Sequence, residues 1–230
     1  MKTLSFVAAA TLATRRLATG RLAAALLLLG ACLAAPGLAQ TQSTAVALPE
    51  QTPNQPAVVA GPRVLLETSM GRIVVELYPE KAPRTVANFL SYVRDGHYNG
   101  TVFHRVISDL LVQGGGYTPD LEIKPERAGI PNEANNGLSN LRGTISAARR
   151  PGDKDSARAQ FFINTVDNRQ FDFRNDTTPA LTGYCVFGRV VEGMDVIDKV
   201  RLVATAARAP LRGDVPASPV LVERAAVLEP

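Results

Sequence analysis

Short apolar runs separated by turn residues dominate the chain from position 63 onward. The runs Val64–Ser69 and Arg72–Tyr78 flank Met70-Gly71. A glycine between two such runs typically supplies the turn of a β-hairpin. We therefore expect two paired strands at the start of the folded region.

A helical pattern follows in Lys81–Arg94. Pro83 suits the first helical turn, because proline lacks the N–H that would be unpaired there. Gly96 is placed to end the helix. One apolar stripe at helical spacing is formed by Ala82, Val86, Phe89, Leu90 and Val93. The segment is predicted to be a helix that packs one face against a core.

The remaining pattern is one of short strands and long loops. A second helical pattern at Met194–Val203 is carried by Val196, Ile197, Val200 and Leu202. Residues 219–227 are predicted to form a closing strand. The other strand candidates are Thr101–Val106, Leu110–Gln113, Gly143–Ala148, Gln160–Asn164 and Cys185–Val190. Many strands with two helices predict a mainly β fold, a closed β-barrel whose ends the helices cover.

The charge of the chain is unevenly distributed. There are 25 Lys and Arg against 21 Asp and Glu, a formal net charge of +4. Four of the bases precede Cys32, in a stretch without an acid: Lys2, Arg15, Arg16 and Arg21. The rest of the chain is nearly neutral. A nucleic-acid-binding groove needs clustered bases in the body of the chain, so we expect no nucleic-acid partner.

The first 39 residues have the order of a secretory signal peptide. Basic residues precede the apolar run Leu22–Leu29, and small residues follow it. The run is too short to be assigned as a membrane-spanning helix. Cleavage after Ala39 is the favoured interpretation. The alternative is that Leu29-Gly-Ala-Cys32 acts as a lipobox, which would make Cys32 a lipidated N-terminus and anchor the protein in a membrane.

The rest of the chain consists of two parts that differ in composition. Residues 40–62 are rich in Gln, Thr, Ala, Val and Pro and nearly uncharged, which predicts a flexible leader. Residues 63–230 are predicted to form one folded domain. Cys185 would be the one cysteine left after cleavage, so a disulfide framework is excluded. We expect it to be a buried small hydrophobe.

Four segments carry the residues that chemistry could use. They are Phe103–Thr118, Asn132–Ala148, Ala159–Asn164 and Gly183–Met194. From the residues alone, Arg105 would be a surface arginine on a strand. The glycines after Gln113 lack the Gly-Lys-Ser/Thr of a phosphate loop. With His97 and His104 as the two histidines, no metal cluster is expected. No Ser/Cys–His arrangement indicates a hydrolase.

Taken together, these segments resemble the cyclophilin family, and most closely the bacterial periplasmic members. The resemblance rests on Phe103-His-Arg105, Gln113-Gly-Gly115 and Gln160-Phe-Phe162, and it extends from about Arg63 to the C-terminus. It implies a closed eight-stranded antiparallel β-barrel with a helix at each end. The site would be a groove on the outside of the barrel.

The resemblance also implies roles for particular residues. Arg105 matches the catalytic arginine, and Gln113 matches the polar residue beside it. The positions that match substrate-binding residues are Leu110, Leu111, Ala148, Gln160, Phe162, Phe171 and Tyr184. His104 is interpreted as structural.

Some positions depart from the family pattern. Gln170 replaces a tryptophan, and Arg149 an asparagine, of many eukaryotic members. We therefore expect weak cyclosporin binding. Leu110 replaces a phenylalanine, which predicts a proline pocket that is looser or differently shaped.

The implied reaction is cis–trans isomerisation of peptide bonds before proline in exported, periplasmic proteins. Rotation about the amide makes and breaks no bond, so no cofactor and no metal are expected. An arginine can donate a hydrogen bond to the proline nitrogen as amide resonance is lost. The alternative is a module that binds proline-containing polypeptides without catalysis, or a chaperone. We expect a monomer.

Overall fold

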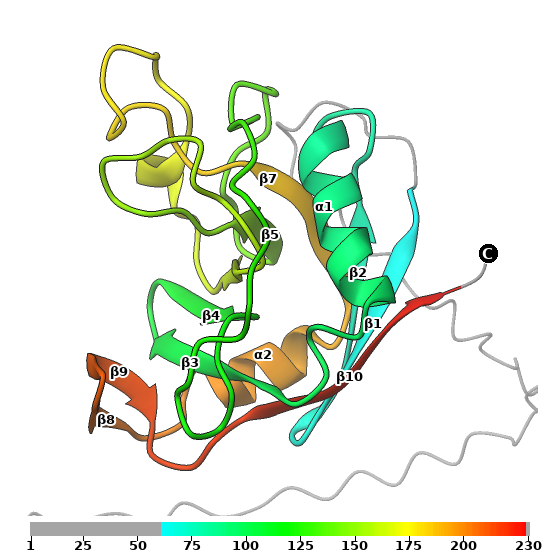
Figure 1. The fold of residues 1–230 in the computed structure, drawn as a ribbon, viewed down its shortest axis with the longest axis vertical. Helices are drawn as coiled ribbons and strands as arrows, with labels where there is room; N and C mark the ends of the chain where they lie inside the picture. Colours follow the sequence, from blue (N-terminus) through cyan, green and yellow to red (C-terminus); the bar gives the residue numbers. More distant parts are fainter. Residues whose placement is uncertain (1–60, 229–230) are drawn as a thin grey trace, which may run out of the picture. The chain divides into compact units, whose positions relative to one another are not determined.

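The computed structural model describes residues 61–228. The expected signal peptide, nearly all of the expected leader and the lipidation candidate Cys32 lie outside the described residues. Those assignments stay predictions. Within residues 61–228 the chain forms ten strands, two α-helices and one short 3-10 helix (Figure 1).

Eight of the strands close into a barrel, in the order β1-β10-β3-β4-β6-β5-β7-β2. Every neighbouring pair in it is antiparallel. The barrel strands are β1 (Arg63–Thr68), β2 (Gly71–Leu77), β3 (Thr101–Ile107), β4 (Leu111–Gly114), β5 (Thr144–Ala147), β6 (Phe161–Asn164), β7 (Val186–Glu192) and β10 (Leu221–Leu228). The expected closed eight-stranded barrel is confirmed.

The first hairpin forms as its pattern predicts. β1 and β2 pair from Arg63 opposite Glu76 to Thr68 opposite Gly71. Gly71 has a φ of 134°, a conformation that is costly for residues with a Cβ. An added Cβ would also lie 2.8 Å from Val196 of the second helix. The turn therefore requires glycine for both its backbone and its packing.

Two α-helices pack against the barrel. Helix α1 (Pro83–Arg94) follows the end of β2 and has proline in its first turn. Helix α2 (Met194–Val200) lies against Gly71, where β2 begins. The buried residues of both helices join the same core cluster that fills the barrel. Cys185 is 3% exposed, which confirms that it is a buried small hydrophobe.

The second helix ends earlier than its pattern predicts. Leu202, assigned to its apolar stripe, is 68% exposed. The amides of Leu202 and Val203 bond to carbonyls three residues back instead of four. This tighter turn changes which residue faces inward, and Val203 packs against the core instead.

One element was not predicted. Strands β8 (Thr205–Arg208) and β9 (Leu211–Pro216) form a separate two-stranded sheet. Figure 1 shows this hairpin beside β3. Its inner side is held by a small cluster of Val102, Leu121 and Val215. Val215 is 3% exposed, so the hairpin is packed onto the barrel.

Candidate active site: a groove on the barrel wall

All nine residues expected at the site line one groove, of about 630 Å³. They are Arg105, Leu110, Leu111, Gln113, Ala148, Gln160, Phe162, Phe171 and Tyr184. The structure therefore brings together residues that are up to 79 positions apart in the sequence, from Arg105 to Tyr184.

The centre of the groove is a row of three residues on adjacent strands. Arg105 lies opposite Gln113 in the β3–β4 pair, and Gln113 lies opposite Phe162 in the β4–β6 pair. Directly opposed residues project from the same face of a sheet. Their chain neighbours, such as Val112 and Ile163, join the core inside the barrel. The row consequently faces outward, where the expected external groove lies.

A hydrogen bond connects two glutamines beside this row. Gln113 Nε2 donates to Gln160 Oε1 over 3.1 Å. Gln160 packs directly on the backbone of Gly116, where a Cβ would lie 2.6 Å from the glutamine side chain. The last glycine of the Gly114–Gly116 run thus makes room for a groove side chain. Its function is steric, and phosphate binding is not needed to account for it.

Three aromatic rings form the apolar wall of the groove. Phe162 makes edge contacts with Phe171 and Tyr184, at centroid distances of 5.8 and 5.5 Å. The Phe171 and Tyr184 rings are 5.1 Å apart. The Tyr184 amide also bonds to the Phe171 carbonyl over 2.8 Å. Rings in edge contact stabilise one another beyond their buried area, so the three rings form one packed wall.

A buried polar network supports the loops that carry these rings. Asn168 Nδ2 donates to the Leu110 carbonyl over 2.8 Å and to Asn164 Oδ1 over 2.7 Å. Asp172 accepts the Asn140 amide over 2.7 Å. Buried amides that are fully paired fix one arrangement of the surrounding backbone. The network therefore sets the positions of Leu110 and of the loop that carries Phe171.

Arg149 contributes to the wall and is not a free groove residue. Its guanidinium lies 4.6 Å from the Tyr184 ring centroid. It also donates to the carbonyls of Gly183 and Pro179, over 3.0 and 2.6 Å. An arginine held in this way covers one face of Tyr184 with positive charge.

His104 lines the groove but is almost fully buried, at 4% exposed. Its ring is 4.5 Å from the Tyr117 ring. Burial lowers the pKa of His104 from 6.5 to about 4. The side chain is therefore neutral at physiological pH, which agrees with the structural role expected for it.

The polar edge of the groove includes an acid. Asp214 Oδ2 lies 3.5 Å from Arg105 Nε. Asp214 belongs to β9, and its neighbours Leu211, Arg212 and Gly213 line the same groove. None of these four was among the residues expected at the site.

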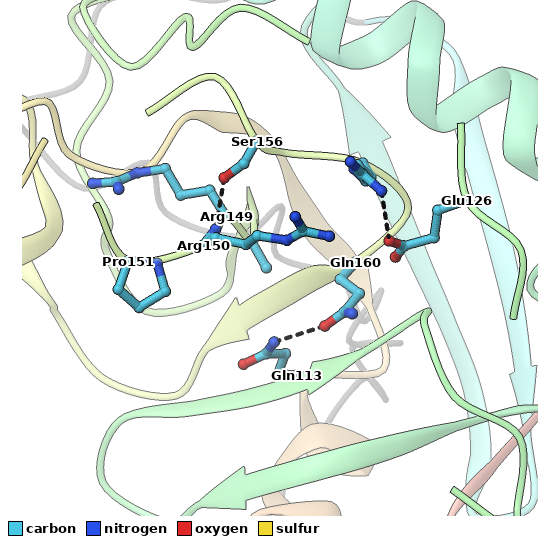
Figure 2. Close-up of a pocket in the computed structure, with 9 residues that line it drawn as sticks. Gln113, Glu126, Arg149, Arg150, Pro151, Ser156 and Gln160 are labelled. Carbon is cyan, nitrogen blue, oxygen red and sulfur yellow. Dashed lines mark hydrogen bonds and ion pairs between the residues drawn. The ribbon is translucent and has the colours of Figure 1, made fainter. Parts of the chain in front are cut away.

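A second pocket, of about 190 Å³, adjoins the groove. Both are lined by Gln113, Ala148, Arg149, Pro151 and Gln160. Figure 2 shows Arg149, Arg150 and Glu126 around it. Arg158 forms an ion pair with Glu126 at 3.9 Å. Three arginines against one glutamate give the lining a positive charge.

Across residues 61–228, no group of three or more His, Cys, Asp or Glu side chains is placed to hold a metal ion. No helix in that part of the chain has the length and apolarity to cross a membrane.

A family model described as cyclophilin type peptidyl-prolyl cis-trans isomerase/CLD matches residues 63–227. The chain belongs to the cyclophilin family. The catalysed reaction of the family is the isomerisation of peptide bonds before proline, and the chain is an enzyme of this class.

Bacterial cyclophilins are similar to the chain over almost their whole length. It is 54% identical to peptidyl-prolyl cis-trans isomerase cyp18 of Streptomyces antibioticus, over 72% of the chain and 98% of that protein. It is 49% identical to peptidyl-prolyl cis-trans isomerase B of Escherichia coli, over 72% and 99%. For isomerase A of Dickeya dadantii the identity is 46%, over 75% and 88%.

Solved cyclophilin structures share the fold. AquaCyp293 from Hirschia baltica superposes with a TM-score of 0.58 at 25% identity, over 75% of this chain and 77% of that chain. A cyclophilin of Cryptosporidium parvum gives the same TM-score at 20% identity, over 74% and 98%.

Two parts of this cyclophilin site could not be predicted from the sequence. The asparagine network lacks a sequence signal, since buried and exposed asparagines look alike in a sequence. The hairpin had a weak signal. Ala209-Pro210 separates two short segments, and Gly213-Asp214 is a pair that tolerates unusual backbone angles. The strands of the hairpin are short and polar, so the sequence did not indicate them as strands.

Proposed function

We propose that the chain isomerises X–Pro bonds in exported polypeptides and that Arg105 assists rotation of the amide. The observation that carries this proposal is the row from Arg105 through Gln113 to Phe162 across one outward face of the barrel. The row supports the proposal because a cation and an apolar pocket lie on the two sides of one groove.

Catalysis of this reaction requires stabilisation of the transition state only. Rotation about the peptide bond breaks amide resonance and costs roughly 18–20 kcal/mol, while the cis and trans states before proline differ by about 1 kcal/mol. In the twisted state the proline nitrogen regains its lone pair. A guanidinium that donates to this nitrogen interacts more strongly with the twisted state than with either planar state, and this difference accelerates rotation.

The apolar wall has a separate task. The Phe162, Phe171 and Tyr184 rings would hold the proline ring, while Gln113 and Gln160 contact the substrate backbone. Ala148 also lines the groove. Holding the ring fixes one side of the amide, so that thermal motion turns the other side.

We propose that the protein acts after it has been exported. The expected signal peptide in residues 1–39 supports a periplasmic location, with a lipidated Cys32 as the alternative that would tether the enzyme to a membrane. We propose a monomer that acts on proline-containing polypeptides without a cofactor. Mass spectrometry of the mature protein tests the location. A chain beginning at Gln40 supports cleavage after Ala39, and a diacylglyceryl mass on Cys32 contradicts it.

Activity of the wild type and of Arg105→Ala in a protease-coupled assay with a proline-containing peptide tests the catalytic proposal. We expect the substitution to lower kcat/KM by about 100-fold or more, the scale of losing a transition-state donor. Far-UV circular dichroism should be unchanged, because Arg105 is on the outer face. Near-normal activity of the variant would overturn the arginine mechanism. An inactive wild type would favour the binding module.

A further inference from the structure

The β8–β9 hairpin brings a charged residue to the reacting arginine. Asp214 Oδ2 lies 3.5 Å from Arg105 Nε, and the two side chains are 46% and 43% exposed. Among residues 61–228, Asp214 is the ionic partner of Arg105, and the terminal guanidinium nitrogens of Arg105 make no hydrogen bond. The contact is at the inner nitrogen, so it leaves the outer two able to donate to a substrate.

The backbone fixes the direction of the Asp214 side chain. Asp214 has a φ of 60°, in the left-handed region. Aspartate, asparagine and glycine adopt this region far more readily than other residues. The next residue, Val215, is anchored in the cluster with Val102 and Leu121. An unusual backbone angle beside a buried anchor thus holds the carboxylate at the rim of the groove.

An exposed arginine side chain is not held in one orientation. Its side chain has four rotatable bonds, and holding such a chain in one conformation costs conformational entropy. An exposed ion pair contributes little to folding stability, so Asp214 has little importance for stability. A substrate that covers the groove would exclude water from the pair and strengthen it.

We propose that Asp214 is a positioning residue: it holds the guanidinium of Arg105 so that its outer nitrogens point at the proline nitrogen in the twisted state. The inference rests on the proposed role of Arg105. It extends the catalytic unit from the barrel wall to the β8–β9 hairpin.

The test is steady-state kinetics of Asp214→Gly and Asp214→Asn. Both replacements tolerate the left-handed angle. Glycine removes the contact, whereas asparagine keeps an oxygen that can accept from Arg105 Nε. We expect kcat to fall by about 10-fold for glycine and about 3-fold for asparagine, with KM within twofold of the wild type. Glu67→Gln is the matched control, because the Glu67–Arg224 pair has the same 3.5 Å separation far from the groove. It should keep full activity.

A double-mutant cycle separates positioning from a loosened hairpin. In an Arg105→Lys background, which has no guanidinium to orient, Asp214→Gly should lower kcat by less than twofold. An equal loss in both backgrounds would overturn the inference, as would a kcat of Asp214→Gly within twofold of the wild type. If Arg105→Ala itself proves active, the proposed role of Arg105 fails, and the positioning role fails with it. If Arg105→Ala is inactive and Asp214→Gly is normal, only the positioning role fails.

Discussion

The two sides of the groove are built in different ways. On one side, three aromatic rings contact one another at 5.1–5.8 Å and rest on a network of buried asparagines. On the other side, Arg105 is half exposed and has one ionic contact at 3.5 Å, across to a separate hairpin. The apolar side is preformed by packing. The polar side depends on a few directed contacts.

This contrast indicates how binding and catalysis are divided. An apolar wall touches the proline ring equally in the planar and twisted states, and so it lowers KM without raising kcat. A donor aimed at the proline nitrogen acts only on the twisted state. The two sides should therefore respond to mutation in different kinetic parameters.

The largest effect short of removing the arginine is expected from Arg105→Lys. Lysine keeps the charge but has no planar fork of donors and no Nε to contact Asp214. We expect kcat to fall by about 30-fold or more, with KM nearly unchanged. Steady-state kinetics with one proline peptide measure both parameters. If lysine restores full activity, positive charge alone suffices, and the geometric part of the account is wrong.

Phe171→Ala tests the opposite side. Phe171 is part of the ring cluster but is not fully buried, so its removal should weaken the proline pocket without emptying the core. We expect KM to rise by about 5- to 10-fold with kcat within twofold, from the lost apolar contact. Ile123→Ala, at an exposed residue outside the groove, is the control. A fall in kcat with unchanged KM would contradict the division of tasks.

The positive pocket beside the groove predicts a smaller preference among substrates. Arg150 is exposed at its edge, and in the described part of the chain its guanidinium has no ion pair. A peptide with glutamate near the proline should have a kcat/KM about 3-fold above that of the same peptide with lysine at that position. Arg150→Ala should remove most of this difference. An unchanged ratio would show that the pocket does not contact the substrate.

The smallest expected effect concerns stability. Because the pKa of His104 is lowered from 6.5 to about 4, the unfolded chain takes up a proton on this residue before the folded chain does. The stabilisation of the folded state that comes from a neutral, buried His104 is present above pH 6.5 and is lost as pH falls toward 4. Between pH 7.5 and pH 5, this residue should lower the unfolding free energy by about 2 kcal/mol.

Urea unfolding of the wild type and of His104→Phe at the two pH values measures this effect. The pKa of His97 is also lowered, chiefly by burial, so it contributes in the same direction in both proteins. The variant should therefore lose about 2 kcal/mol less than the wild type. Equal losses of unfolding free energy in the two proteins would show that His104 is protonated as readily in the folded state as in the unfolded state.

Much of the fold and part of the site followed from the sequence. Apolar runs, turn residues and helical spacing predicted β1, β2 and α1, because the two strands are buried along most of their length and the helix buries one face. The groove residues could be named only through the resemblance, since Arg105 alone is typical of a surface arginine. Asp214 could not be found. Its strand is polar, and its contact with Arg105 joins residues 109 positions apart in the sequence.

The most direct test of the account is exchange NMR on a proline peptide bound to wild type and to Arg105→Ala. We expect the variant to bind the peptide through the aromatic wall, within a few-fold of the wild-type affinity. Its catalysed cis–trans exchange should slow by about 100-fold. Exchange at the wild-type rate in the variant would contradict the central claim that Arg105 drives the rotation.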